Sequence, residues 1–109
     1  MANDETITLY RPIGQKELEL IEANGYTAFP PRLPEQPLFY PVLNEEYATQ
    51  IARDWNAKHN EDKRGYVTRF RVRLDFLRNY DVQIVGGSSH REYWIPAEKL
   101  DEFNSNIMV

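Results

Sequence analysis

The chain has 109 residues, 41% of them hydrophobic and 13% aromatic, which fits one globular domain over residues 1–109 and excludes a disordered chain. Its formal net charge of −4 argues against a dedicated nucleic-acid-binding protein. There is no cysteine, no apolar run near the roughly 18 residues that cross a bilayer and no apolar segment at the acidic N-terminus, so we expect a cytosolic protein without disulfides, a membrane span or a signal peptide.

The first quarter of the chain predicts a strand followed by a helix. Residues 6–11 alternate and are rich in β-formers, and we expect Pro12 to end this strand. Residues 14–24 place Leu and Ile among Glu and Lys and end at Asn-Gly, which is typical of a short amphipathic helix. Residues 26–29 are read as a brief strand.

The middle of the chain contains a proline-rich segment and the clearest helix. Residues 30–37, PPRLPEQP, keep the backbone extended, and we interpret them as a rigid connection rather than as a ligand for a proline-binding domain. A strand is expected over 38–42. Asn44 can cap a helix over 45–58, in which apolar residues recur at spacings of three and four.

The last third predicts mainly strands. Residues 66–74 alternate strictly, with three arginines on the face opposite Phe70, Val72 and Leu74. A helical turn is expected over 75–80. Two further strands, 81–85 and 90–95, flank a Gly-Gly-Ser-Ser turn, and a short helix is expected over 97–104. The fold class that this order predicts is α+β, with a small, mixed, mostly antiparallel sheet and two main helices.

Glu92 is the strongest candidate for chemistry. A strand would place His90 and Trp94, two residues to either side, on the same face as this carboxylate. Such a group can bind a sugar hydroxyl or stabilise a cationic transition state, and His90 can act as a general base. The alternative for Glu92 is a plain ion pair with a neighbouring arginine. Acidic residues and histidines do not cluster at a metal-binding spacing, so we expect no metal site.

Arginine is the second source of candidates, because it outnumbers lysine 9 to 4 and forms a good fork for phosphate. Arg11, at the end of the first strand, can grip a phosphate or be a surface residue. The stripe Arg69, Arg71 and Arg73 can follow a polyanion, or be a solvated face that pairs with helix carboxylates such as Glu17. Tyr40 and Tyr47 can stack on the ring of a ligand, but Tyr47 lies on the apolar face of its helix, so we expect it in the core.

Several of these motifs together resemble a known group of proteins. Leu9-Tyr10-Arg11, Phe39-Tyr40 and His90-Arg91-Glu92, followed by Ile95-Pro96, stand in an order similar to that in small bacterial proteins labelled ADP-ribosylation/crystallin-like and, more widely, in the ADP-ribosyltransferase superfamily. The similarity extends over nearly the whole chain. Two positions depart from the wider pattern: no Ser-Thr-Ser follows the middle strand, and His90 replaces a Glu or Gln.

The resemblance implies an ADP-ribosyltransferase-like fold and a cleft that binds NAD or ADP-ribose. It implies that Glu92 holds a ribose hydroxyl while the nicotinamide–ribose bond breaks, and that ADP-ribose can pass to an unknown acceptor. The site residues that follow are Glu92 and His90 for catalysis, and Tyr10, Arg11, Tyr40 and Trp94 for binding the dinucleotide. We expect Arg11 and Glu92 on adjacent strands, facing one cleft.

A different class of function stays open. The chain can instead be a non-catalytic protein-interaction module, such as a partner or antidote of another bacterial protein. Its surface would then be the proline segment 30–37 or the stripe Arg69, Arg71 and Arg73. A cleft that joins Arg11, Tyr40 and Glu92 would favour the nucleotide-binding interpretation, and three scattered side chains would favour the module.

Overall fold

A computed structural model describes residues 5–25, 27–32, 35–56, 65–86 and 90–108, with the side chains of residues 55 and 56 outside this description. The prediction of an α+β domain with antiparallel pairing is confirmed, because every strand pair in the described part of the chain is antiparallel. The elements follow in this order: β1 (Thr6–Ile13), α1 (Gln15–Ala23), β2 (Leu38–Phe39), α2 (Glu45–Ile51), β3 (Tyr66–Arg73), α4 (Leu74–Leu77), β4 (Val82–Ile84), β5 (Arg91–Tyr93), β6 (Ile95–Pro96), α5 (Leu100–Ser105) and β7 (Ile107–Met108).

The central sheet consists of β1, β3 and β7 in the order β1-β3-β7. The expectation that Pro12 ends the first strand is wrong, since β1 continues to Ile13 and Pro12 lies opposite Val67. Tyr10, two residues earlier, directs its backbone N–H and C=O away from β3, to Val42. Pro12 has the same orientation, so its missing N–H faces the side away from β3 and costs no ladder hydrogen bond.

Segment 38–43 joins the central sheet to the β4–β5 hairpin. It runs antiparallel to 91–96 in one register, with Leu38 opposite Pro96, Phe39 opposite Ile95 and Val42 opposite Glu92. Val42 also exchanges two backbone hydrogen bonds of 2.8 Å with Tyr10. The strand expected over 38–42 is therefore present as β2 and the bridge residue Val42, whose bridges to Tyr10 and Glu92 link β1 to the β4–β5 hairpin.

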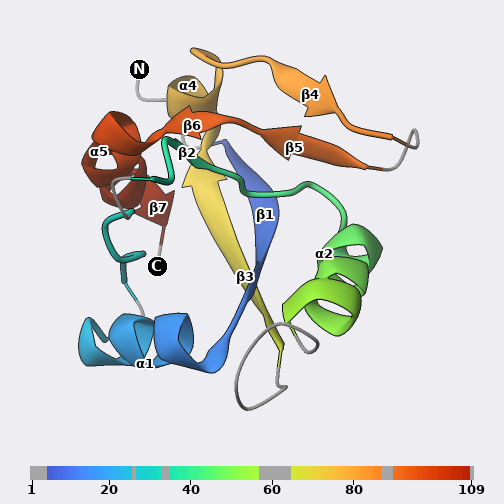
Figure 1. Cartoon of the computed structure of the whole chain (residues 1–109). Coiled ribbons are helices and arrows are strands. Elements are labelled where there is room, and N and C mark those ends of the chain that lie inside the picture. Colours follow the sequence, from blue (N-terminus) through green and yellow to red (C-terminus); the bar gives the residue numbers. More distant parts are fainter. Residues whose placement is uncertain (1–4, 26, 33–34, 57–64, 87–89, 109) are drawn as a thin grey trace.

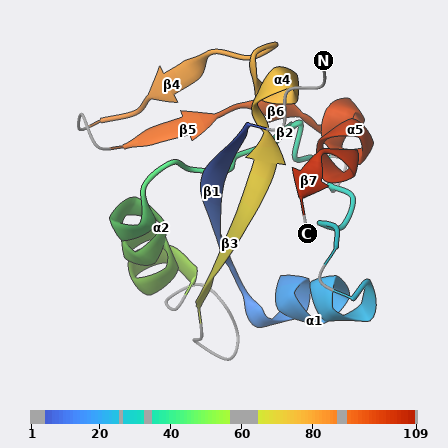
Figure 2. The same cartoon turned by 180° about the vertical axis from the view of Figure 1, so that it is seen from behind.

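The helices lie on both sides of the sheet. Figures 1 and 2 show α2 on one side of β1 and β3 and both α1 and α5 on the other side, with the β4–β5 hairpin extending over α2. Asn44 caps α2 as predicted, because its side-chain oxygen accepts a 3.1 Å hydrogen bond from the Tyr47 N–H. The helix changes after Ile51 into a π-helical turn, η1 (Ala52–Asn56), and residues 57–58 lie outside the described part.

Other boundaries differ from the sequence predictions by a few residues. The helix expected over 97–104 is a 3₁₀ turn over Ala97–Lys99 followed by α5, and β7 was not predicted. Residues 27–29 do not form the expected strand, and residue 26 lies outside the described part. At the start of the turn after β4, Gly86 has a φ of 86°, a conformation that favours glycine.

The core is rich in aromatic side chains. Phe103 of α5 is fully buried, and its ring centroid lies 5.1 Å from that of Phe39 and 5.9 Å from that of Phe76. Phe29, although outside regular structure, packs on Phe39 at 5.0 Å and on Phe70 at 4.9 Å. This cluster fills the space between the central sheet and α5.

Helix α2 uses its small residues to pack on the sheet. Ala48 and Ala52 are buried, whereas Tyr47 and Ile51 are only partly buried. The prediction that Tyr47 lies in the core is therefore wrong. The sequence also predicts Trp55 on the packed face of this helix, and its side chain lies outside the described ones. Ala48 and Ala52 thus form the buried side of the helix, and Tyr47 lies beside it, where its hydroxyl reaches Glu92 of β5.

Candidate functional site

The sheet register assigns the predicted site residues to two faces. Residues paired across an antiparallel bridge share a face, and successive residues alternate. Tyr10, Val42 and Glu92 form one row and therefore share a face, here called the Glu92 face. His90 and Trp94, the residues directly before and after β5, belong to it by alternation from Glu92, and Tyr40 belongs to it because the common register places it opposite Trp94.

Arg11 departs from the expected arrangement. The strands β1 and β5 are not adjacent, because Val42 lies between Tyr10 and Glu92. Arg11 follows Tyr10 and so leaves β1 on the opposite face, together with the buried Leu9 and Ile13. The expectation that Arg11 and Glu92 face one cleft from neighbouring strands is therefore wrong, because the alternation of β1 turns Arg11 toward the core.

Glu92 is a buried carboxylate held by neutral donors. Its residue is 8% exposed. Trp94 Nε1 donates a 2.7 Å hydrogen bond to Glu92 Oε1, and the Tyr47 hydroxyl donates a 3.3 Å hydrogen bond to Oε2. The sequence also allowed an ion pair between Glu92 and a neighbouring arginine, and no such pair is present among the described residues. A carboxylate accepts at about four lone-pair positions, so two remain for another donor.

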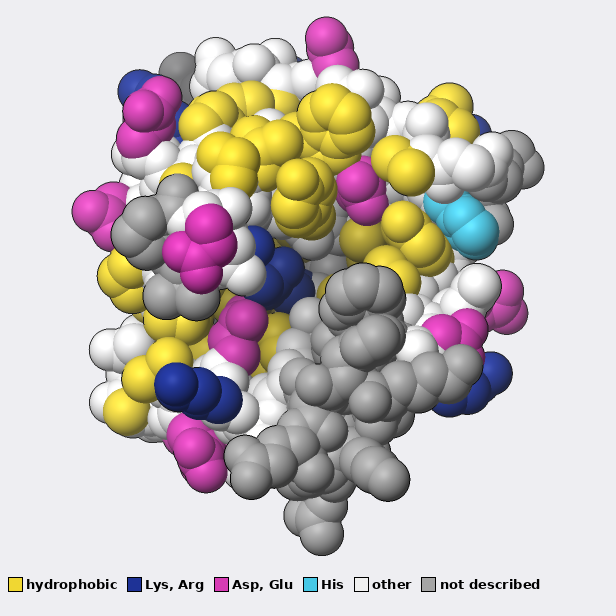
Figure 3. All heavy atoms as spheres, in the orientation of Figure 1, with side chains coloured by type: hydrophobic (Ala, Val, Ile, Leu, Met, Phe, Trp, Pro, Cys, Tyr) yellow, Lys and Arg dark blue, Asp and Glu magenta, His cyan; other side chains and the backbone are white. Residues whose placement is uncertain are grey.

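Aromatic rings surround this carboxylate. The Tyr47 ring stacks on the His90 ring at 4.3 Å with an interplanar angle of 9°. On the other side, Tyr40 and Trp94 meet edge to face at 6.4 Å, and they are 38% and 40% exposed. Such exposed rings can pack on a planar ligand, and Figure 3 shows hydrophobic side chains gathered around acidic ones in the upper part of this view.

Tyr47 belongs to this site, although the sequence predicted it in the core. Burial raises the pKa of the Tyr47 phenol, and the negative charge of Glu92 and the hydrogen bond to it raise it further. The phenol therefore stays protonated as a donor to the carboxylate. Its position on the apolar face of α2 gave no signal for this role, because the contact joins residues 45 positions apart.

The raised phenol pKa values predict a loss of stability at high pH. Burial raises the pKa of Tyr80 and Tyr93 as well as that of Tyr47. A group whose pKa is higher in the folded state contributes its full stability below the unfolded pKa, about 10 for tyrosine, and loses it as the pH rises further. We expect the free energy of unfolding to fall above about pH 10, and less steeply in Tyr47→Phe. Urea titrations of both proteins from pH 8 to 11 measure this, and equal slopes would contradict it.

Arg11 has a structural partner. Its Nε donates to Glu17 Oε2 at 2.7 Å and its Nη2 to Glu17 Oε1 at 3.1 Å, and the side chains are 10% and 22% exposed. The guanidinium also lies over the Phe39 ring, 4.5 Å from its centroid. Glu17 thus pairs with Arg11 and not with the stripe on β3. Arg69 and Arg71 of that stripe are exposed, and Arg73 is partly buried.

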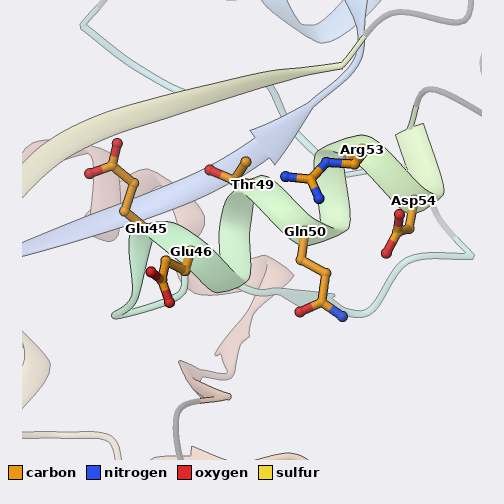
Figure 4. Close-up of a pocket in the computed structure, with 6 residues that line it drawn as sticks. All are labelled: Glu45, Glu46, Thr49, Gln50, Arg53 and Asp54. Atoms are coloured by element: carbon orange, nitrogen blue, oxygen red, sulfur yellow. The ribbon is translucent and has the colours of Figure 1, made fainter.

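Other surface features do not converge on this site. A hollow of about 600 Å³ runs along α2 and η1, and Figure 4 shows its side chains spread along one helix and not directed at a common point. Its lining residues are Glu45, Glu46, Thr49, Gln50, Arg53 and Asp54.

In the described part of the chain, no three acidic or histidine side chains are grouped to hold a metal ion, and no helix is long and apolar enough to cross a membrane.

Five of the six predicted site residues thus share the Glu92 face, and Arg11 lies on the other face. Comparison of the chain with protein-family models, with curated proteins and with solved structures found no match.

Proposed function

We propose that this protein binds NAD or ADP-ribose at the Glu92 face, as an ADP-ribosyltransferase-like protein. The observation that carries the proposal is the buried Glu92 carboxylate, which neutral donors hold next to an exposed pair of rings, Tyr40 and Trp94. A negative charge without a cationic partner in the described structure favours a ligand that brings hydroxyl donors or positive charge. The rings suit the planar nicotinamide or adenine.

The proposed chemistry is cleavage of the bond between ribose and nicotinamide. The bond breaks with its electron pair leaving on the nicotinamide nitrogen, which becomes neutral. Water or an acceptor then bonds to the ribose carbon and loses a proton. Glu92 would accept a hydrogen bond from a ribose hydroxyl and stabilise the cationic sugar. His90, stacked on Tyr47 beside this carboxylate, is the candidate that takes the proton.

The proposal is tested by calorimetric titration of the protein with NAD and with ADP-ribose. We expect binding of at least one of them, together with quenching of Trp94 fluorescence as a ring packs on it. A Trp94→Phe variant keeps an aromatic side chain but removes the indole and its Nε1 donor to Glu92. Quenching that disappears in this variant is assigned to Trp94 and not to Trp55. Absence of binding by the wild-type protein at millimolar ligand would overturn the proposal.

A second candidate, an interaction module, is favoured by a different observation. Strand β4 pairs only with β5 in the described structure and exposes apolar side chains, with Val82 41% and Ile84 62% exposed. An exposed apolar edge strand can pair with a strand of another protein. If NAD and ADP-ribose both fail to bind, this edge becomes the first surface to test for a protein partner.

A further inference from the structure

Two arginines from separate segments lie near the same aromatic ring. Arg11 of β1 and Arg32 of the proline-rich segment place their Cζ atoms 4.5 Å and 6.0 Å from the centroid of Phe39. The Phe39 ring itself is 1% exposed, so the two cations lie at the border of the core. Two like charges in such a place need an anion nearby.

The described structure supplies one carboxylate for these two cations. Glu17 binds Arg11 side-on through two hydrogen bonds, which neutralises that guanidinium. Arg32 donates from Nε to the Leu38 carbonyl oxygen at 3.1 Å, a neutral acceptor. Two guanidiniums and one carboxylate leave one positive charge, and it resides on Arg32, whose ion-pairing nitrogens have no carboxylate partner among the described residues.

The pKa of Arg32 agrees with a guanidinium that has no carboxylate partner among the described residues. Burial lowers the pKa of the Arg32 guanidinium, and the positive charge of Arg11 lowers it further, while Glu17 and Tyr40 act in the opposite direction. Arginine nevertheless stays protonated in proteins. An added anion would therefore be held more strongly here than beside a fully exposed arginine, because burial reduces screening by water.

We propose that Arg32 is the anion-binding residue of this protein, and that it takes a phosphate group of a nucleotide ligand while the Arg11–Glu17 pair positions the Phe39 ring beneath it. The fork of a guanidinium matches two phosphate oxygens. Arg32 thus replaces Arg11 in the role that the sequence suggested for the first strand.

The nucleotide part of the inference rests on the proposed function, because it depends on the rings near Glu92. Tyr40 connects the two places along the chain, because it directly follows Phe39, the ring near Arg32, and contacts Trp94 edge to face. Phe39 and Tyr40 lie on opposite faces of segment 38–43 by alternation, so a ligand with a phosphate at Arg32 would pass the edge of β2 that pairs with no strand in the described structure to place its ring system against Tyr40 and Trp94. A diphosphate between two nucleosides has this combination of charge and rings.

The test uses inorganic pyrophosphate as the probe and full-length protein. Titration of wild type, Arg32→Gln and Arg71→Gln is followed by calorimetry, with circular dichroism to show that each variant is folded. Arg71 is the matched control, because it is an exposed arginine on β3 with the same charge. We expect Arg32→Gln to weaken pyrophosphate binding at least tenfold, Arg32→Lys to restore part of it, and Arg71→Gln to bind as wild type does.

Each result decides a separate point. Absence of pyrophosphate binding by wild type, or equal weakening in Arg32→Gln and Arg71→Gln, would overturn the assignment of Arg32. Binding of pyrophosphate that depends on Arg32, without binding of NAD or ADP-ribose, would keep the anion site and reject the proposed function. Binding of NAD with equal affinity by wild type and Arg32→Gln would keep the function and reject the phosphate contact.

Discussion

Glu92→Gln is expected to reduce nicotinamide release from NAD by at least about 100-fold while NAD affinity changes little, the scale seen when one group that stabilises transition-state charge is removed. The negative charge matters most when the ribose becomes cationic, so its loss affects the transition state more than binding. The amide can keep both local hydrogen bonds: its oxygen accepts from Trp94 Nε1, and its NH₂ donates to the Tyr47 hydroxyl oxygen. The local structure is therefore expected to persist.

The measurement is nicotinamide release beside an NAD titration for each variant. Glu45→Gln is the matched control, because it makes the same change in charge at an exposed position of α2. We expect this control to release nicotinamide as wild type does. Equal release by wild type and Glu92→Gln would remove Glu92 from the catalytic role, and binding of NAD without any release by wild type would leave a non-catalytic binder.

Phe103→Ala should lower the free energy of unfolding by about 3–5 kcal/mol, the usual range for truncating a buried phenylalanine. Phe103 is fully buried, and its ring lies within 6.5 Å, centroid to centroid, of those of Phe29, Phe39, Phe70 and Phe76. Removing it leaves a cavity at the centre of the aromatic cluster, between α5 and the central sheet. This loss is a large fraction of the roughly 5–15 kcal/mol that stabilises a small domain.

Urea denaturation at 25 °C measures this change through the midpoint, provided that the dependence on denaturant stays constant. Phe103→Leu provides a gentler variant if the alanine variant does not fold, and we expect it to lose less stability. Leu20→Ala, at a residue of α1 that is 45% exposed, should change the free energy of unfolding by less than about 0.5 kcal/mol. A similar loss in the Leu20 and Phe103 variants would show that the aromatic cluster is not the main core.

Local signals in the sequence were sufficient for much of the fold. The Asn44 cap, the Asn-Gly stop after α1 and the alternation of β3 each act over a few residues, and the structure has each of them. Pro12 misled the prediction because its effect depends on which edge of β1 is paired. That edge is set by β3, in which Val67 lies opposite Pro12 at a distance of 55 positions along the chain and has no local signature.

Local patterns predicted only the part of the site around β5, and the resemblance to a known family added Tyr10 and Tyr40. Alternation along one strand was enough to group His90, Glu92 and Trp94. The contact of Tyr47 with Glu92 and the approach of Arg32 to Phe39 join separate elements, so they depend on tertiary packing. The pairing of Arg11 with Glu17 crosses the corner from β1 to α1, and this change of direction is not visible in the spacing of the two residues.

The single register between segments 38–43 and 91–96 limits how the chain can change in length. Phe39 and Val42 are three residues apart, as are Ile95 and Glu92, and both pairs lie opposite each other. Deleting or inserting one residue between them would turn Val42 to the other face and break either its bridge to Tyr10 or its bridge to Glu92. We therefore expect insertions and deletions in these two segments to disrupt the fold, even beside a side chain as exposed as that of Tyr40.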